Sequence, residues 1–284
     1  MIFAADKSIP TLMRTKKNRV WELDFLRGFA VIAMCFDHLM CDFVFLKSWF
    51  SNYRTVNNAF IARMVKFATM YWDSAFRFWA HYIFVFLFLF LVGTSCAFSR
   101  DNVKRGSQLF VVAWIFTGAS LVMKKIGFLE DGIIFGILDC IALSILCAAA
   151  VDIATKRWRI ANVFAPLVIG VAIWAFGIHM KLWDLGSPYD REFTAAHLID
   201  YIIGTQGYGD DWFGIFPYVG AVLMGMYFGK AAYPKRVSLL PRLDGKWNKP
   251  VKFVGRHALV FYVVHQVVIA GIVAAVCMCL GYRM

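Results

Sequence analysis

The sequence predicts an all-α protein: a polytopic transmembrane helix bundle of about seven spans, with its amino terminus in the cytoplasm. Hydrophobic residues make up 61% of the 284 residues and charged residues 17%, whereas soluble domains carry about 25% charged residues. Several apolar stretches reach the roughly 20 residues with which a helix crosses about 30 Å of hydrocarbon. These stretches, such as FVFLFLFLVGTSCAF, lack the alternation of polar and apolar residues that a membrane-spanning strand shows.

The charges give the bundle its expected orientation. We expect spans near residues 22–46, 78–98, 108–123, 133–152, 160–180, 212–230 and 253–281. With these spans, 19 Lys/Arg fall in the amino-terminal arm and the even-numbered loops, against ten in the opposite set. Because Lys and Arg concentrate in cytoplasmic loops, this bias places the amino terminus inside and the carboxyl terminus outside. The same bias accounts for the net charge of +12, so we expect contact with the lipid bilayer and no nucleic-acid partner.

One apolar and aromatic segment, residues 57–79, does not fit this scheme cleanly. It is interrupted by Arg63, Lys66 and Asp73. We expect it to lie in the membrane interface, to re-enter the membrane, or to add an eighth span.

The chain divides into a cytoplasmic basic arm, residues 1–20, and a single transmembrane domain, residues 21–284. The arm lacks a small-residue cleavage site, so the first span is expected to stay attached. Seven cysteines show neither a CxxC pair nor a Cys/His metal spacing. No metal site and no disulfide framework is therefore expected.

The first span, WELDFLRGFAVIAMCFDHLMCDF, carries one polar stripe. At about 100° per residue, its members fall within about 100° of arc; they are Asp24, Arg27, Gly28, Cys35, His38 and Asp42. Asp37 falls off the stripe and receives no role. Ionisable side chains are costly inside a membrane, so the stripe is expected to face protein or a water-filled space and to be functional.

Spacing along this stripe separates two roles. His38 and Asp42 are four residues apart, so the carboxylate can accept from one ring nitrogen and leave the other as a general base. Arg27 lies about 16 Å from His38 along the helix, too far to touch it. It is expected to bind a second ligand.

Two loops are unusual in composition. Residues 181–211 hold six of the 18 acidic residues together with Trp183, Tyr189, Tyr201 and Tyr208. Such a loop suits a sugar, although an ordinary interfacial aromatic belt is the simpler explanation. Residues 230–256 hold eight Lys/Arg, which favours a polyanionic cofactor such as coenzyme A but also follows from topology alone.

The motif LDFLRG, with ten residues between Arg27 and His38, resembles the Arg-to-His signature of the transmembrane acyltransferase superfamily. More closely, the chain resembles bacterial relatives of the heparan-alpha-glucosaminide N-acetyltransferase catalytic domain. The segments that carry this resemblance are WELDFLRGFAVIAMCFDHLMCD, FLFLVGTSCAFSR, IIFGILDCIALS, DDWFGIFPYVGAVLMGMYFGK and FVGRHALVFYVVHQ.

The resemblance implies acyl transfer, with acetyl as the expected group, from cytosolic acetyl-CoA to an extracytoplasmic sugar or glycan. His38 matches the family's catalytic histidine and Arg27 the superfamily arginine. Asp42 is expected to support His38, and Asp24, Arg256 and His257 to lie with Arg27 on the cofactor side. Asp139 stands where histidine or a neutral hydrogen-bonding residue is expected, so it either orients a partner or pairs with Arg27.

Three further residues are expected to face the site: His265, Gln266 and Tyr262, the last two as oxyanion donors. Transfer is direct or passes through an acylated His38. The expected location is the bacterial cytoplasmic (inner) membrane, and the apolar faces are compatible with a homo-oligomer. The rival functions are a proton-coupled solute carrier and a silent lipid-binding or assembly partner. Acetyl-CoA binding separates the enzyme from a carrier, which would show solute flux without an acyl donor.

Overall fold

The computed structural model describes residues 19–127, 131–182, 188–190, 192–209 and 211–284. Of the predicted basic arm, all but the last two residues lie outside these ranges. Within them the chain is helical, and its only β pairing is an isolated bridge between Tyr189 and Gly207. The predicted all-α class is confirmed.

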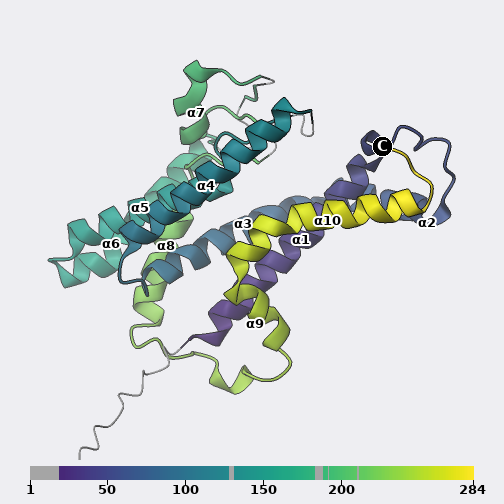
Figure 1. Ribbon diagram of the computed structural model, residues 1–284. Helices are drawn as coiled ribbons and strands as arrows, with labels where there is room; N and C mark the ends of the chain where they lie inside the picture. Colours follow the sequence, from purple (N-terminus) through teal and green to yellow (C-terminus); the bar gives the residue numbers. More distant parts are fainter. Residues whose placement is uncertain (1–18, 128–130, 183–187, 191, 210) are drawn as a thin grey trace, which may run out of the picture.

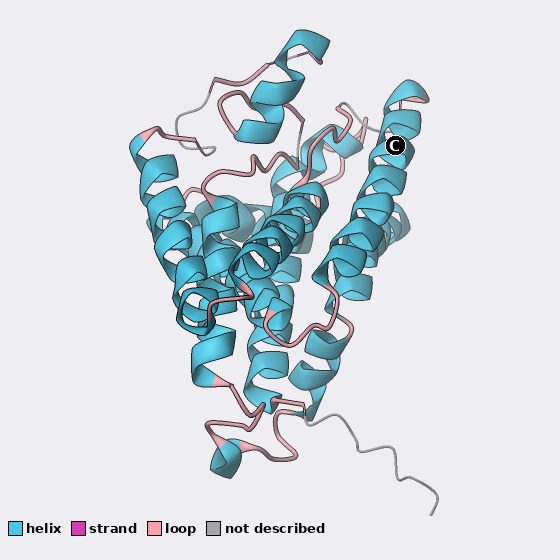
Figure 2. Ribbon diagram, turned by 90° about the vertical axis from the view of Figure 1, so that its left-hand side faces the viewer, coloured by secondary structure: helices cyan, strands magenta, loops and turns pink. Residues whose placement is uncertain are grey.

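Ten α-helices form the described part of the chain: α1 (Trp21–Trp49), α2 (Ala59–Trp72), α3 (Ala75–Cys96), α4 (Asn102–Lys125), α5 (Ile137–Thr155), α6 (Arg159–His179), α7 (Leu198–Ile203), α8 (Tyr218–Ala232), α9 (Lys249–Arg256) and α10 (Ala258–Cys279). Six described helices are long and apolar enough to cross a membrane: α1, α3, α4, α5, α6 and α10. Figure 2 shows helices running side by side, with the connecting loops gathered at two opposite ends. We call the end where α1 begins the inner end and the end where α1 finishes the outer end.

The ambiguous segment 57–79 forms α2 and the first turn of α3. Asn58 caps α2, and Ser74 caps α3 by accepting from the backbone of Arg77. Helix α2 has 14 residues and is not among the six candidate spans. Its buried Ile61 and Ala68 belong to one apolar cluster with residues from the outer half of α1 and from α10. Helices α2 and α3 therefore follow one another as one interrupted passage from the outer to the inner end.

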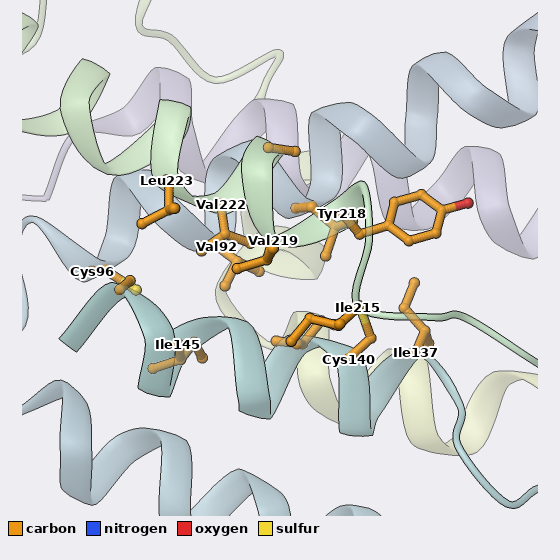
Figure 3. Close-up of a cluster of buried hydrophobic side chains, with 14 of the residues drawn as sticks. Val92, Cys96, Ile137, Cys140, Ile145, Ile215, Tyr218, Val219, Val222 and Leu223 are labelled. Carbon is orange, nitrogen blue, oxygen red and sulfur yellow. The ribbon is translucent and has the colours of Figure 1, made fainter. Parts of the chain in front are cut away.

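The sixth predicted span, 212–230, is shorter as a helix than the pattern suggested. Helix α8 begins only at Tyr218, after Pro217, and has 15 residues. It packs against α3, α5 and α6, and glycines allow close approach, because a Cβ at Gly93 would lie 1.8 Å from the Val222 carbonyl oxygen. Figure 3 shows the resulting core, in which side chains of α3, α5 and α8 meet. Helix α8 is the centre of this half of the molecule.

The other half is built on α1. Helix α9 crosses its inner end, where Gly28 and Gly255 face each other so closely that a Cβ on either would strike backbone. Helix α10 then runs beside α1 towards the outer end, as Figure 1 shows. This pairing of α1 with α9 and α10 brings the last predicted motif against the first.

Candidate functional site

The polar stripe of α1 has two separate groups of partners. Asp24 and Asp42 are both buried, and His38 is half-buried between them. Helix α1 is continuous over all of them, so Arg27 and His38 remain about 16 Å apart along its axis. The two ends of the stripe are therefore separate in depth.

At the inner end, Asp24 holds two arginines. One carboxylate oxygen accepts from Arg27 at 3.2 Å, and the other accepts from Arg256, at the end of α9, at 3.3 Å. Arg27 also donates to the Ser95 hydroxyl on α3 at 2.8 Å. The sequence pattern did not single out Ser95, although it stands in the quoted segment FLFLVGTSCAFSR. Helices α1, α3 and α9 thus meet at the ion pair between Asp24 and Arg27.

His257 lies beside this group but faces outwards. Its ring is exposed, contacts the ring of Phe253, and shares a hydrogen bond of 2.9 Å with the carbonyl oxygen of that residue. The structure therefore brings Asp24, Arg27 and Arg256 together and leaves His257 at the margin.

Half-way along α1, His38 meets His265 of α10. Their ring centroids are 4.8 Å apart and the rings are nearly perpendicular. Nδ1 of His38 lies 3.0 Å from the Met34 carbonyl oxygen, and Nδ1 of His265 lies 2.6 Å from the Tyr262 carbonyl oxygen. Because a carbonyl oxygen only accepts, Nδ1 carries the proton in the neutral form of each ring, and Nε2 of that form has a free lone pair.

The expected hydrogen bond between His38 and Asp42 is replaced by another pairing. Asp42 accepts from the Gln266 side chain at 2.8 Å, while His38 takes the nearer backbone carbonyl of its own helix. A helical side chain can bond to the carbonyl one turn earlier without reaching for a neighbour. Asp42 therefore belongs with Gln266 rather than with His38.

Three buried atoms of this cluster have no hydrogen-bond partner among the described residues: Asp42 Oδ2, His265 Nε2 and Gln266 Oε1. All three are acceptors, given the tautomer of His265. Buried polar atoms are normally satisfied, and leaving one without a partner costs about 1–3 kcal/mol. The cluster is complementary to a group that donates hydrogen bonds.

Tyr262 connects this cluster to the other half of the molecule. Its backbone oxygen holds His265, and its hydroxyl interacts with Asp211, which precedes α8. Asp211 was quoted only as part of DDWFG, and no spacing in the sequence relates it to Tyr262. Long-range contacts of this kind appear only once α10 and the α8 segment are packed.

Asp139 does not pair with Arg27. It lies in the first turn of α5 and accepts from the backbone N–H of Gly136 at 3.2 Å, which caps that helix. Arg27 has its carboxylate partner in Asp24. If Asp139 orients a partner, the partner seen among the described residues is the backbone of Gly136.

Asp37, which has no place on the stripe, is paired with α2 and α3. Arg77 donates to both of its carboxylate oxygens, at 3.0 and 2.9 Å, and the Tyr71 hydroxyl donates at 3.0 Å. The Arg77 guanidinium also covers the Trp72 ring at 3.8 Å. This ion pair ties the start of α3, just after the break between α2 and α3, to Asp37, the residue that precedes His38. Arg77 was the available signal, as a lone arginine at the start of an apolar span.

We call residues 188–190 and 192–209 the outer segment. Several of its hydrogen bonds converge on the carboxylate of Asp190. This carboxylate accepts from Tyr201 at 2.6 Å and from Gln206 at 2.7 Å, and lies 2.8 Å from Nδ1 of His197. The bond to His197, aided by that to Tyr201, lowers the pKa of Asp190, and the carboxylate raises the pKa of His197. Tyr189 and Tyr208 lie nearby, whereas the expected Trp183 lies outside the described residues.

Comparison with known proteins identifies one family, and the match includes the residues described above. The model of the family described as heparan-alpha-glucosaminide N-acetyltransferase, catalytic, matches residues 19–267. This range covers both arginines of the inner end and the cluster around the two histidines. No curated protein and no solved structure matches the chain significantly.

Proposed function

The chain belongs to the heparan-alpha-glucosaminide N-acetyltransferase catalytic family, and we propose that it transfers acetyl from cytosolic acetyl-CoA to an extracytoplasmic sugar or glycan. Membership makes the protein a membrane acyltransferase, in agreement with its six membrane-capable helices. We propose the bacterial cytoplasmic membrane as its location. The observation that carries the proposal is that an arginine group around Asp24 and a histidine pair that includes His38 lie at different depths along α1.

We assign the arginine group to the donor. Arg27 and Arg256 supply guanidinium groups at the inner end, where Asp24 and Ser95 hold them in place. Arginine binds phosphate through two parallel N–H bonds, and coenzyme A carries several phosphate oxygens. Electrostatic contact between Arg27 and Arg105 of α4 adds a further cation to the same region.

His38 is the proposed general base. With Nδ1 bonded to the Met34 carbonyl, Nε2 is free to take the proton of the acceptor hydroxyl or amine. The acceptor oxygen or nitrogen attacks the thioester carbonyl and the carbon–sulfur bond breaks. The thiolate of coenzyme A then takes the proton held by His38 and leaves as the thiol. In the two-step form, Nε2 of His38 attacks the thioester first, the carbon–sulfur bond breaks and the thiolate of coenzyme A leaves. The acceptor then attacks the acyl group, the carbon–nitrogen bond to His38 breaks, and the acceptor's proton neutralises the thiolate.

We propose that the three buried atoms without a hydrogen-bond partner among the described residues bind the nucleophilic hydroxyl or amine of the acyl acceptor. A hydroxyl or amine donates hydrogen bonds to Asp42, Gln266 or His265 and so presents its lone pair to the thioester. This places the acceptor group beside His38 without a bond between His38 and Asp42. The family match gives no support to the carrier alternative.

The test uses the purified full chain in detergent and in lipid nanodiscs. Acetyl-CoA should bind, and slow thioester hydrolysis or acceptor labelling should follow. His38→Ala should reduce turnover by about 10²–10⁴-fold, the usual worth of a positioned base, while binding is retained. Arg27→Gln should weaken binding instead. His179→Ala, at the exposed end of α6, is the matched histidine control. Absence of acetyl-CoA binding in both environments would overturn the proposal.

A further inference from the structure

The loop between α8 and α9 presents apolar side chains to its surroundings. We call residues 235–249 the inner-face platform. Five of its large apolar side chains are between 49% and 63% exposed; they are Val237, Leu239, Leu240, Leu243 and Trp247. They lie outside the membrane-spanning helices, and the rest of the described chain leaves about half or more of each of them uncovered. Several large apolar side chains exposed on one short loop indicate a contact surface.

The platform is fixed, because its backbone is tied to the start of α1. The buried carboxylate of Glu22 accepts from the Leu239 N–H at 2.6 Å and from the Ser238 hydroxyl at 2.8 Å. The Trp21 indole donates to the Leu240 carbonyl at 3.1 Å. Polar backbone groups are thereby satisfied towards α1. The Trp247 ring also contacts the rings of Trp21 and Phe25 on α1 along one edge, and it remains 63% exposed.

The inner-face platform also carries positive charges that no acidic side chain of the described chain neutralises. Lys235, Arg242, Lys246 and Lys249 are exposed, and none forms a salt bridge within the described part of the chain. The one acid of the platform, Asp244, is occupied by an ion pair with Lys252. Apolar and cationic side chains are therefore interleaved on one exposed surface.

We propose that the inner-face platform binds the anionic headgroups of the inner leaflet, with its apolar side chains entering the boundary between headgroups and acyl chains. The platform lies at the end of the bundle where α1 begins (Figure 1), which the charge bias predicts to be cytoplasmic. Orientation by positive charge accounts for the cations alone. A surface with both characters fits an anionic lipid interface, where apolar burial and charge act together. This binding is independent of acyl transfer.

The first test follows Trp247 in nanodiscs of phosphatidylcholine, with or without phosphatidylglycerol. The difference between wild type and Trp247→Phe isolates the emission of this residue. Lipids brominated near the glycerol end of the acyl chain should quench it, and phosphatidylglycerol should increase that quenching. Free inorganic phosphate should leave it unchanged. Quenching by aqueous acrylamide without quenching by brominated lipid would overturn the proposal.

The second test removes charge. In Arg242→Gln/Lys246→Gln, the phosphatidylglycerol content needed for half-maximal quenching should rise by roughly fivefold per cation. The matched control is Lys156→Gln/Arg157→Gln, which removes the same charge from the loop between α5 and α6. Thermal unfolding checks that both variants fold. An equal shift in the control would mean that total charge acts rather than the platform, and would overturn the assignment.

Discussion

At the scale of single residues, the role of Asp42 differs most from what its spacing suggested. Four residues separate it from His38, yet its carboxylate binds Gln266 on another helix. The free oxygen of Asp42 is an unpartnered acceptor. Asp42 is therefore placed to hold the acceptor, and the tautomer of His38 depends on the Met34 carbonyl.

This assignment predicts different behaviour for two neighbouring substitutions. Asp42→Asn keeps an acceptor for Gln266, so slow thioester hydrolysis by water should stay within a few-fold of wild type, whereas His38→Ala should lose it. Transfer to an added acceptor should fall in both variants. Hydrolysis and transfer are measured side by side with acetyl-CoA. If Asp42→Asn lost hydrolysis as completely as His38→Ala, Asp42 would orient the base after all.

The Asp190–His197 pair makes the outer segment sensitive to pH. His197 has a raised pKa, so its contribution to stability is full below the ordinary value of 6.5 and is lost as pH rises through the folded-state pKa. Asp190 has a lowered pKa, so its contribution is present above 3.8 and is lost as pH falls through the folded-state pKa. Residues 188–190 and 192–209 should be best protected between these limits.

Hydrogen-exchange protection factors, corrected for intrinsic rates, should be measured between about pH 5.5 and 8.5. They should fall as the pH rises through the pKa of His197. His197→Gln removes the titrating group and should give a flat profile over that range. The prediction is contradicted if His197→Gln responds to pH as the wild type does.

At the scale of elements, glycines decide how closely the helices approach. In a membrane, helix pairs are held by close packing more than by hydrophobic burial, so small residues at contacts matter. The α3–α8 contact shows this, since Cβ atoms at Gly93 and Gly225 would lie 1.8 and 1.9 Å from backbone oxygens of the facing helix. Neither oxygen can move without displacing its helix.

Gly93→Ala should therefore lower the free energy of unfolding by about 1–3 kcal/mol, the usual cost of overpacking. Gly118→Ala in α4 is the matched control, because a Cβ there meets nothing within 4 Å. The control should unfold at or slightly above the wild-type temperature. The measurement is thermal unfolding in one detergent, and equal destabilisation of both variants would contradict the role of the α3–α8 contact.

For the whole molecule, the sequence predicts the helices better than it predicts their contacts. Each segment has a composition that suits its surroundings: spans are uniformly apolar, and the loops on one side are rich in positive charge. Helices α1 and α4–α6 are therefore recognised from composition. The bonds from Asp42 to Gln266 and from Asp37 to Arg77 span different helices. Such pairs depend on helix rotation, which a single sequence does not encode locally. Asp211 beside Tyr262 is missed for the same reason.

The number of crossings determines where the carboxyl terminus lies, and this can be measured. If α2 and α3 form one interrupted passage and α8 forms another, the chain crosses seven times: through α1, α2 with α3, α4, α5, α6, α8 and α10. The carboxyl terminus then lies opposite the amino terminus, as the charge bias requires. A periplasmic alkaline phosphatase fused after Met284 should be active, and a green fluorescent protein there should be dark. Fusions after Pro234, on the inner side, should behave in the reverse way and serve as the control. An eighth crossing through residues 57–79 would exchange the two results, and a reporter between α2 and α3, after Asp73, would show which passage had been miscounted.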